Sequence, residues 1–217
     1  MTTIQETAGM KTLLHVGCGH QGKEALPPLD FENEWREVRV DIDPGVNPDV
    51  IDDIRTLATI PDGSAHYLFS KHNLEHLEFH EVPKCLANFH RVLDDTGFLI
   101  IRTPNLEQIC RAILQVGVEK ELYTSIVDGE KNPVMPMDIL FGASWEIEKG
   151  NHFMAHRTAF TAKNLEQKLR DAGFEHVDIK PAEASYELLA VAVKKIDGNV
   201  YWPLRGKTPP AAATTRV

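Results

Sequence analysis

A glycine-rich turn follows the first apolar run of the chain and could bind a cofactor. The run Leu13–Val16 breaks into Gly17, Cys18 and Gly19. Glycines directly after a strand let the backbone approach a ligand and leave amide N–H groups free to bind it. Asp41 follows Gly19 by twenty-two residues, at the end of the next predicted strand, where a carboxylate can accept hydrogen bonds from a ribose diol. The combination predicts a site for an adenosine-bearing cofactor, with an ordinary turn and a surface aspartate as the alternative.

Histidines cluster in the stretch from His72 through His76 to His80. Two histidines four residues apart on a helix could share a metal ion. However, His72 and His80 would lie about 12 Å apart along that helix, so the three histidines cannot bind one ion. Because no other ligand set has metal spacing, we predict no metal site. We interpret His76 as structural, and His72 as a candidate catalytic residue close to the cofactor or the substrate.

A second candidate catalytic residue is His156, which lies in the segment 150–160 before the last predicted helix. A histidine that is neutral near pH 7 can take a proton from a hydroxyl or carboxyl group. His156 could therefore act as a base or position an acceptor. The alternative is a histidine that only pins this segment to the sheet.

Strands and helices alternate along the chain, which predicts an α/β fold. Apolar or alternating runs predict strands over 12–16, 37–43, 65–70, 98–101, 174–180 and 187–194. Helical spacing of apolar residues predicts helices over 81–93, 106–116 and 164–172. A helix that could begin after the glycine turn is cut short by two prolines, Pro27 and Pro28.

The chain of 217 residues fits a single domain. We expect a flexible segment over 1–11, one domain over 12–198 and an irregular tail over 199–217. Residues 105–155 lack a clear period after their first helix, and we interpret them as an insertion that covers the substrate.

Composition excludes several classes of partner. The formal net charge of −9 is opposite to the basic surface that nucleic acids or anionic membranes require. No apolar stretch approaches the ~20 residues of a membrane span, and the first ten residues show no signal-peptide pattern. Three widely spaced cysteines (Cys18, Cys85 and Cys110) are typical of reduced thiols. We therefore expect a cytoplasmic protein; the sequence leaves the oligomeric state open, including a homodimer.

The ordered set of segments resembles the class I S-adenosylmethionine-dependent methyltransferases, in their type-11-like branch. The resembling segments are 14–19, 40–44, 53–57, 61–64, 70–77, 91–104, 156–160 and 171–174. The resemblance implies a Rossmann-like fold with a mostly parallel seven-stranded sheet and a reversed C-terminal β-hairpin. It also implies S-adenosyl-L-methionine as the cofactor.

The resemblance assigns cofactor-binding roles to residues that match the family's motifs. Gly17, Cys18 and Gly19 would line the methionine and ribose portion. Asp41 would bind the ribose hydroxyls, and Ile42 would pack on the adenine. Asp53 would accept from the adenine amino group with Ile54 beside it, and Ser70, Lys71 and His72 would form the floor between cofactor and substrate. His15 occupies the position of an acidic residue that normally helps to hold the methionine end. This substitution and the shortened helix are the two departures from the family.

These features together predict methyl transfer from S-adenosylmethionine to a small-molecule or peptidic acceptor. Oxygen is slightly favoured as the acceptor atom because a neutral histidine suits a hydroxyl or carboxyl group. Two alternatives stay open: a non-catalytic binding module with this fold, and another adenosine-cofactor enzyme such as a nicotinamide oxidoreductase.

Overall fold

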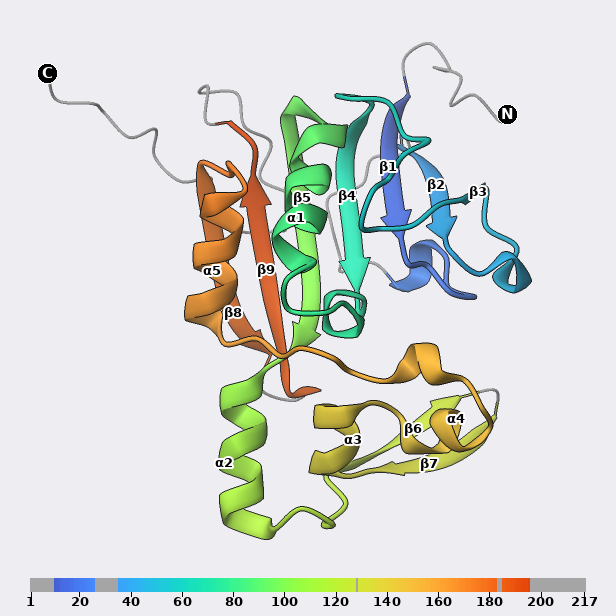
Figure 1. Cartoon of the computed structure of the whole chain (residues 1–217), viewed down its shortest axis with the longest axis vertical. Helices are drawn as coiled ribbons and strands as arrows, with labels where there is room; N and C mark the ends of the chain where they lie inside the picture. Colours follow the sequence, from blue (N-terminus) through green and yellow to red (C-terminus); the bar gives the residue numbers. More distant parts are fainter. Residues whose placement is uncertain (1–9, 26–34, 128, 183–184, 196–217) are drawn as a thin grey trace, which may run out of the picture.

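The computed structural model describes residues 10–25, 35–127, 129–182 and 185–195, and a seven-stranded sheet forms its centre (Figure 1). The strands are β1 (Lys11–Val16), β2 (Trp35–Asp41), β3 (Val50–Ile51), β4 (Ala65–Lys71), β5 (Leu93–Pro104), β8 (His176–Ala182) and β9 (Glu187–Val193). Their order is β3-β2-β1-β4-β5-β9-β8. Strands β1 to β5 pair in parallel, whereas β9 is antiparallel to both β5 and β8. The predicted sheet with its reversed C-terminal hairpin is confirmed.

Successive apolar residues of the strands point to opposite faces of the sheet, as the two-residue period of a strand requires. Leu14, Leu68 and Leu99 belong to the cluster on one face, and Leu13 and Phe69 belong to the cluster on the other. The first face carries α1 (Val82–Val92) and α5 (Ala162–Asp171), which lie in front of the sheet in Figure 1. No α-helix among the described residues contributes to the second cluster.

The two helices on the sheet follow the apolar spacing of the sequence. Every third or fourth residue of α1 from Val82 to Val92 is buried. The N-terminus of α5 is capped by Thr161, whose hydroxyl accepts from the Asn164 N–H at 3.2 Å while Asn164 reaches back to the Thr161 N–H at 2.9 Å. Such reciprocal bonds satisfy amide groups that have no partner inside the helix. No helix among the described residues is long and apolar enough to cross a membrane.

The insertion is more regular than the sequence predicts. It contains α2 (Leu106–Val116), the hairpin strands β6 (Tyr123–Val127) and β7 (Glu130–Val134), α3 (Pro136–Phe141) and α4 (Ser144–Glu148). Its own apolar cluster, which includes Ile109, Val134 and Ile139, is separate from the two clusters of the sheet. The insertion lies below the sheet in Figure 1.

Short 3-10 turns occupy the connections between strands. They are η1 (Lys23–Ala25), η2 (Pro44–Val46), η3 (Leu74–His76) and η4 (His152–Met154). The predicted strand over 37–43 ends two residues early because the Asp43 carboxylate caps η2, accepting from the Gly45 N–H at 2.7 Å. Strand β5 extends beyond the predicted strand over 98–101 at both ends, and its pairing with β4 is irregular between Ala65 and Tyr67.

The expectations for the two ends of the chain fall largely outside the described residues. Residues 1–9 of the segment expected to be flexible lie outside them, and Lys11 already belongs to β1. The tail over 199–217 lies outside them altogether.

Candidate active site

The parallel strands β1, β2, β4 and β5 end at the edge of the sheet that faces the insertion (Figure 1). Ligands of open α/β sheets bind at this carboxyl edge, where the strand order reverses. Here the reversal lies between β1 and β4. The segments that follow these strands therefore form the candidate active site.

The glycine turn after β1 has the backbone geometry that a ligand-binding loop needs. Gly17 and Gly19 have φ angles of 58° and 52°, in the left-handed region that favours glycine. The Gly19 N–H donates to Asp41 Oδ2 at 2.8 Å, and the Asp43 N–H donates to Asp41 Oδ1 at 3.0 Å. Each carboxylate oxygen keeps a lone pair for a further donor such as a ribose hydroxyl. A Cβ on Gly19 would meet no atom of the described residues within 4 Å.

Arg39 on β2 braces this turn against the loop after β2. Its guanidinium donates to the carbonyl oxygens of Gly19 at 2.6 Å, Gln21 at 3.1 Å and Asn47 at 3.0 Å. The adjacent Cys18 is buried, and its burial raises the thiol pKa to about 11. Since the thiol stays protonated, Cys18 can serve a ligand mainly through its backbone.

The end of β4 is tied to the end of β1. Asn73 donates to the Val16 carbonyl at 2.9 Å and to the hydroxyl of the buried Ser70 at 3.2 Å. Lys71 is partly buried, and its pKa is lowered by burial and by the nearby Arg102 guanidinium. Ser70 and Lys71 thus lie beside the glycine turn, where the resemblance places the floor of the cofactor site.

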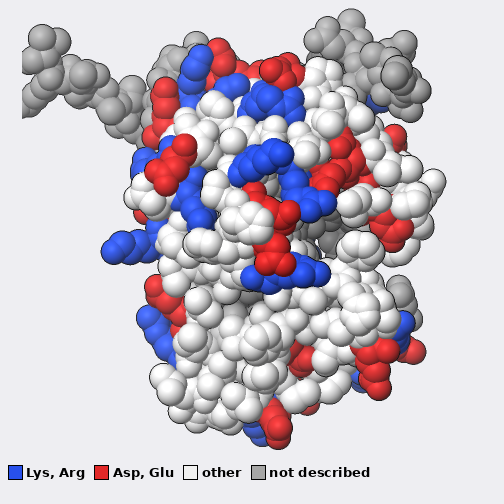
Figure 2. Space-filling view, viewed as in Figure 1, with Lys and Arg blue, Asp and Glu red and all other residues white. Residues whose placement is uncertain are grey.

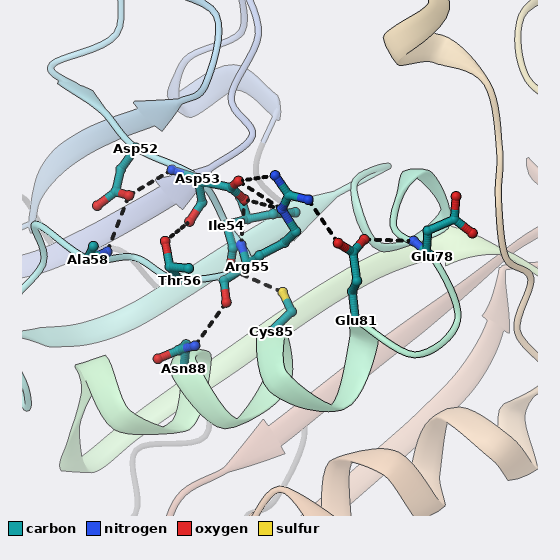
Figure 3. A network of polar contacts seen from close by, with 10 residues as sticks. All are labelled: Asp52, Asp53, Ile54, Arg55, Thr56, Ala58, Glu78, Glu81, Cys85 and Asn88. Carbon is teal, nitrogen blue, oxygen red and sulfur yellow. Dashed lines mark hydrogen bonds and ion pairs between the residues drawn. The ribbon is translucent and has the colours of Figure 1, made fainter.

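The segment after β3 is held by a dense polar network (Figure 3). Asp53 accepts from Arg55 Nε at 2.8 Å and Nη2 at 2.5 Å, and Arg55 Nη1 donates to Glu81 at 2.8 Å. Burial raises the pKa of Asp53, but the hydrogen bonds from Arg55 outweigh that effect and lower it. The Cys85 thiol donates to the Ile54 carbonyl at 3.3 Å. The network fixes Asp53 and Ile54 against α1, so Asp53 stays ionised as an acceptor.

His15 is the penultimate residue of β1, and its side chain is buried. It is 1% exposed, and its Nδ1 lies 2.9 Å from Glu37 Oε1 on the neighbouring strand β2. Burial lowers the pKa of His15 more than the Glu37 carboxylate raises it. The neighbouring carboxylate gives this unusual histidine a structural partner; its predicted role at the methionine end of the cofactor stays a prediction.

His72 bridges two carboxylates that come from distant parts of the chain. Its Nδ1 lies 3.1 Å from Glu75 Oε1, and its Nε2 lies 2.7 Å from Glu187 Oε1 at the start of β9. Burial opposes protonation, but the hydrogen bonds that a protonated His72 donates to Glu187 and Glu75 raise its pKa to about 9. A protonated imidazole has no lone pair to accept a proton. The geometry therefore favours positioning, not base catalysis, for His72.

The ring of His156 lies next to the ring of His76. The two rings meet at an interplanar angle of 68° with centroids 4.9 Å apart. His156 Nδ1 donates to the Ile139 carbonyl at 2.9 Å. Burial lowers the pKa of His156 in spite of the Glu75 carboxylate, so the ring is neutral near pH 7 and its Nε2 carries a lone pair.

Sequence reasoning missed three residues that hold this site together. Arg39 has no motif around it. Glu75 lies in the stretch from His72 to His80, where only the histidines were considered as functional residues. Glu187 lies 115 residues from His72, a separation that no local pattern reveals. By contrast, Gly19 and Asp41 were predicted as a pair and are hydrogen-bonded to each other. Ile42, which follows Asp41, is 49% exposed and offers an apolar surface beside that carboxylate.

Comparison with protein families matches residues 14–101 to the methyltransferase domain family. This range contains the glycine turn, Asp41, the Asp53 network and the end of β4. Over these residues the chain matches the type-11 branch of the methyltransferase domain. The predicted recognition is thereby confirmed. No curated protein sequence matches the chain.

Solved structures share the fold of this chain at low sequence identity. A 1,6-didemethyltoxoflavin-N1-methyltransferase from Burkholderia thailandensis, with bound substrate and S-adenosylhomocysteine, has a TM-score of 0.52 and 16% identity over 86% of this chain and 72% of its own. The CurJ carbon methyltransferase has a TM-score of 0.54 and 12% identity over 88% and 50%. A possible exported protein from Bordetella parapertussis has a TM-score of 0.55 and 13% identity over 87% and 64%. The chain thus spans less than two thirds of the last two structures.

Proposed function

We propose that this protein transfers a methyl group from S-adenosylmethionine to a small-molecule or peptidic acceptor. The observation that carries the proposal is the Asp41 carboxylate, which is hydrogen-bonded to the Gly19 amide inside the matched methyltransferase domain. An acidic group beside a glycine turn at the carboxyl edge of a sheet is suited to a ribose. The neighbour with bound S-adenosylhomocysteine supports the same cofactor class.

The residues present fit this cofactor. The Cβ position of Gly19 is not crowded by any described atom, which is compatible with the methionine and ribose portion lying against this turn. Asp41 would accept from the ribose hydroxyls, and the exposed Ile42 would pack on the adenine. Asp53, held ionised by Arg55, would accept from the adenine amino group. When bound, the cofactor would supply an electrophilic methyl group on sulfur.

The insertion would cover the acceptor. It lies across the edge of the sheet where the site is, and most of its surface in Figure 2 is uncharged, whereas both signs of charge are interspersed over the sheet and its helices. Exposed apolar side chains of the insertion include Leu114, Ile126 and Phe153. We therefore expect an acceptor with an apolar part.

Oxygen is the acceptor atom that the site favours. The neutral His156 could take the proton of a hydroxyl or carboxyl group through its Nε2 or orient that group. A lone pair on that oxygen would attack the methyl carbon, and the carbon–sulfur bonding pair would stay on sulfur. The fold itself selects no acceptor, because structures named as N1- and carbon methyltransferases share it.

The experiment that tests the proposal is calorimetric titration with S-adenosylmethionine, S-adenosylhomocysteine and NADH in parallel. We expect micromolar affinity for the two sulfur ligands and none for NADH. Asp41→Asn should weaken both by about tenfold, the equivalent of about 1.4 kcal/mol. The matched control is Asp43→Asn in the same loop, which should retain the affinity. Binding of NADH alone would point to an oxidoreductase, and indifference to Asp41→Asn would reject the assigned cofactor site.

A further inference from the structure

Three side chains with metal-binding atoms meet where the insertion returns to the sheet. Glu75 and His76 belong to the turn after β4, and His156 lies eighty residues further along the chain. One ligand atom of each lies within 4.8 Å of the others. In Figure 1 the turn below β4 lies next to the segment that joins the insertion to α5, and the N–H groups of Arg157 and Thr158 donate to the Glu75 carbonyl at 2.7 Å and 3.1 Å.

Both histidines are oriented as metal ligands usually are. His76 Nδ1 lies 3.2 Å from the Ala155 carbonyl, and His156 Nδ1 lies 2.9 Å from the Ile139 carbonyl. Because a carbonyl oxygen can only accept, each Nδ1 must carry the proton and each neutral ring has its lone pair on Nε2. Histidines that bind metals commonly donate their other ring N–H to a backbone carbonyl in this way.

The carboxylate is held in place as well. Glu75 is 1% exposed, and its two oxygens accept from Thr103 Oγ1 at 3.0 Å and pair with His72 Nδ1 at 3.1 Å. Such partners fix the orientation of a ligating carboxylate. Among the residues that the structure describes, no hydrogen bond joins Glu75 to His76 or His156, so hydrogen bonding within the trio does not explain why they converge.

We propose that Glu75, His76 and His156 bind a divalent transition-metal ion, with Zn²⁺ as the first candidate. Two imidazoles and one carboxylate are a donor set for Zn²⁺ with an open fourth position, whereas Mg²⁺ and Ca²⁺ prefer oxygen ligands. Ligand atoms at about 2.1 Å from one ion lie roughly 3.4 Å apart in tetrahedral geometry, which small side-chain rotations could reach. The sequence predicts no metal because its spacing argument tested only His72, His76 and His80; the third ligand lies beyond the insertion.

The open fourth coordination position would let the ion bind the acceptor of the methyl group. This role of the ion rests on the proposed function. A hydroxyl bound to the ion would lose its proton to water more readily. The resulting oxygen would attack the methyl carbon, the carbon–sulfur pair would stay on sulfur, and an ether or ester would form. His156 would then act as a ligand instead of accepting the proton itself.

Metal binding can be tested without any turnover. The chelator-treated full chain, free of a histidine tag, is titrated with ZnCl₂ by calorimetry and then with CoCl₂ by visible absorption. We expect one ion per chain. His76→Ala, His156→Ala and Glu75→Gln should each lose about 100-fold or more in affinity, and Thr103→Val about tenfold. The matched control His80→Ala removes an exposed histidine four residues further along the chain and should bind as the wild type does.

The outcomes separate this proposal from the proposed function. The same preparations are titrated with S-adenosylhomocysteine, whose binding also shows that each variant is folded. Loss of Zn²⁺ affinity with retained S-adenosylhomocysteine affinity supports the metal site. Failure of the wild type to bind either metal, or equal affinity in His76→Ala and His156→Ala, would overturn it. Failure to bind S-adenosylhomocysteine would count against the proposed function alone.

Discussion

Asn73 occupies the space that a side chain at Gly17 would need. A Cβ built on Gly17 would lie 2.0 Å from Asn73 Oδ1, and the same amide donates to the Val16 carbonyl at 2.9 Å. The contact joins the ends of β1 and β4 at the point where the strand order reverses. Gly17 is therefore required for close packing between two loops of the site as well as for its positive φ angle.

The first prediction follows from this contact. Gly17→Ala should lower the free energy of unfolding by about 3 kcal/mol or more, because the strain of a left-handed alanine adds to a collision with Asn73. Denaturant unfolding measures the change, and calorimetry should show loss of S-adenosylmethionine binding.

Gly63→Ala is the matched control for that change. Gly63 has a φ of 63°, and a Cβ there would meet no atom within 4 Å, so it reports the left-handed strain alone, about 1–2 kcal/mol. The double variant with Asn73→Ala should recover part of the loss. Equal losses for the two glycines would show that the collision is relieved at no cost.

The second prediction concerns stability at alkaline pH. The folded pKa of His72 is raised to about 9, above the unfolded value of about 6.5. Its pairing with Glu75 and Glu187 therefore stabilises the fold fully below about pH 6.5 and is lost as the pH rises through about 9. Because 39% of the side chain is exposed, solvent weakens the effect.

Urea unfolding midpoints across this pH range measure the loss. His72→Gln should flatten the alkaline slope, and His80→Gln, at an exposed position, should leave it as in the wild type. On the acid side the sign is opposite, since His72 and Arg102 overcome burial and lower the pKa of Glu187 to about 2. An alkaline slope unchanged by His72→Gln would contradict the prediction.

The third prediction concerns the network around Asp53 (Figure 3). The Arg55 guanidinium donates to both Asp53 and Glu81. In Arg55→Lys it is replaced by a compact ammonium group that cannot bond both carboxylates in this geometry. We expect S-adenosylmethionine affinity to fall about fivefold, the equivalent of about 1 kcal/mol, because Asp53 becomes less fixed. Calorimetry measures the affinity.

A control for this change is Arg111→Lys. Arg111 is 71% exposed and pairs only loosely with Glu107, at 3.6 Å, so the same substitution there should leave affinity unchanged. Retained affinity in Arg55→Lys would mean that Asp53 is positioned by its backbone alone.

The sequence predicts the parts of the fold that depend on local apolar spacing. The predicted bounds of the helix over 106–116 coincide with α2, and those of the helix over 81–93 differ by one residue at each end from α1. The hairpin of β6 and β7 was missed because its strands are largely exposed on both faces, which leaves no alternation of apolar and polar residues to detect.

The contacts of the candidate site likewise differ in whether the sequence could predict them. Gly19 and Asp41 could be paired from the sequence because a fixed strand-to-strand spacing connects them. The pairing of His72 with Glu187, and of Glu75 and His76 with His156, depends on how β9 and the insertion return to the sheet. Contacts across such separations are set by tertiary topology and leave no periodic signal.

The last prediction concerns Asp138, which organises the insertion. It is 6% exposed, accepts from the Met135 N–H at 2.8 Å and from the Ser144 hydroxyl at 2.5 Å, and thereby links α3 to α4. Asp138→Ala would remove both of these part-buried hydrogen bonds, each worth about 1 kcal/mol. Because the apolar cluster of the insertion is separate from those of the sheet, the loss should be local. Hydrogen exchange should accelerate over 130–155 while the strands of the sheet and S-adenosylmethionine affinity stay unchanged. Glu130→Ala, at a 69% exposed position in the same insertion, should leave the exchange as it was, and acceleration throughout the sheet in Asp138→Ala would show that the insertion and the sheet unfold as one unit.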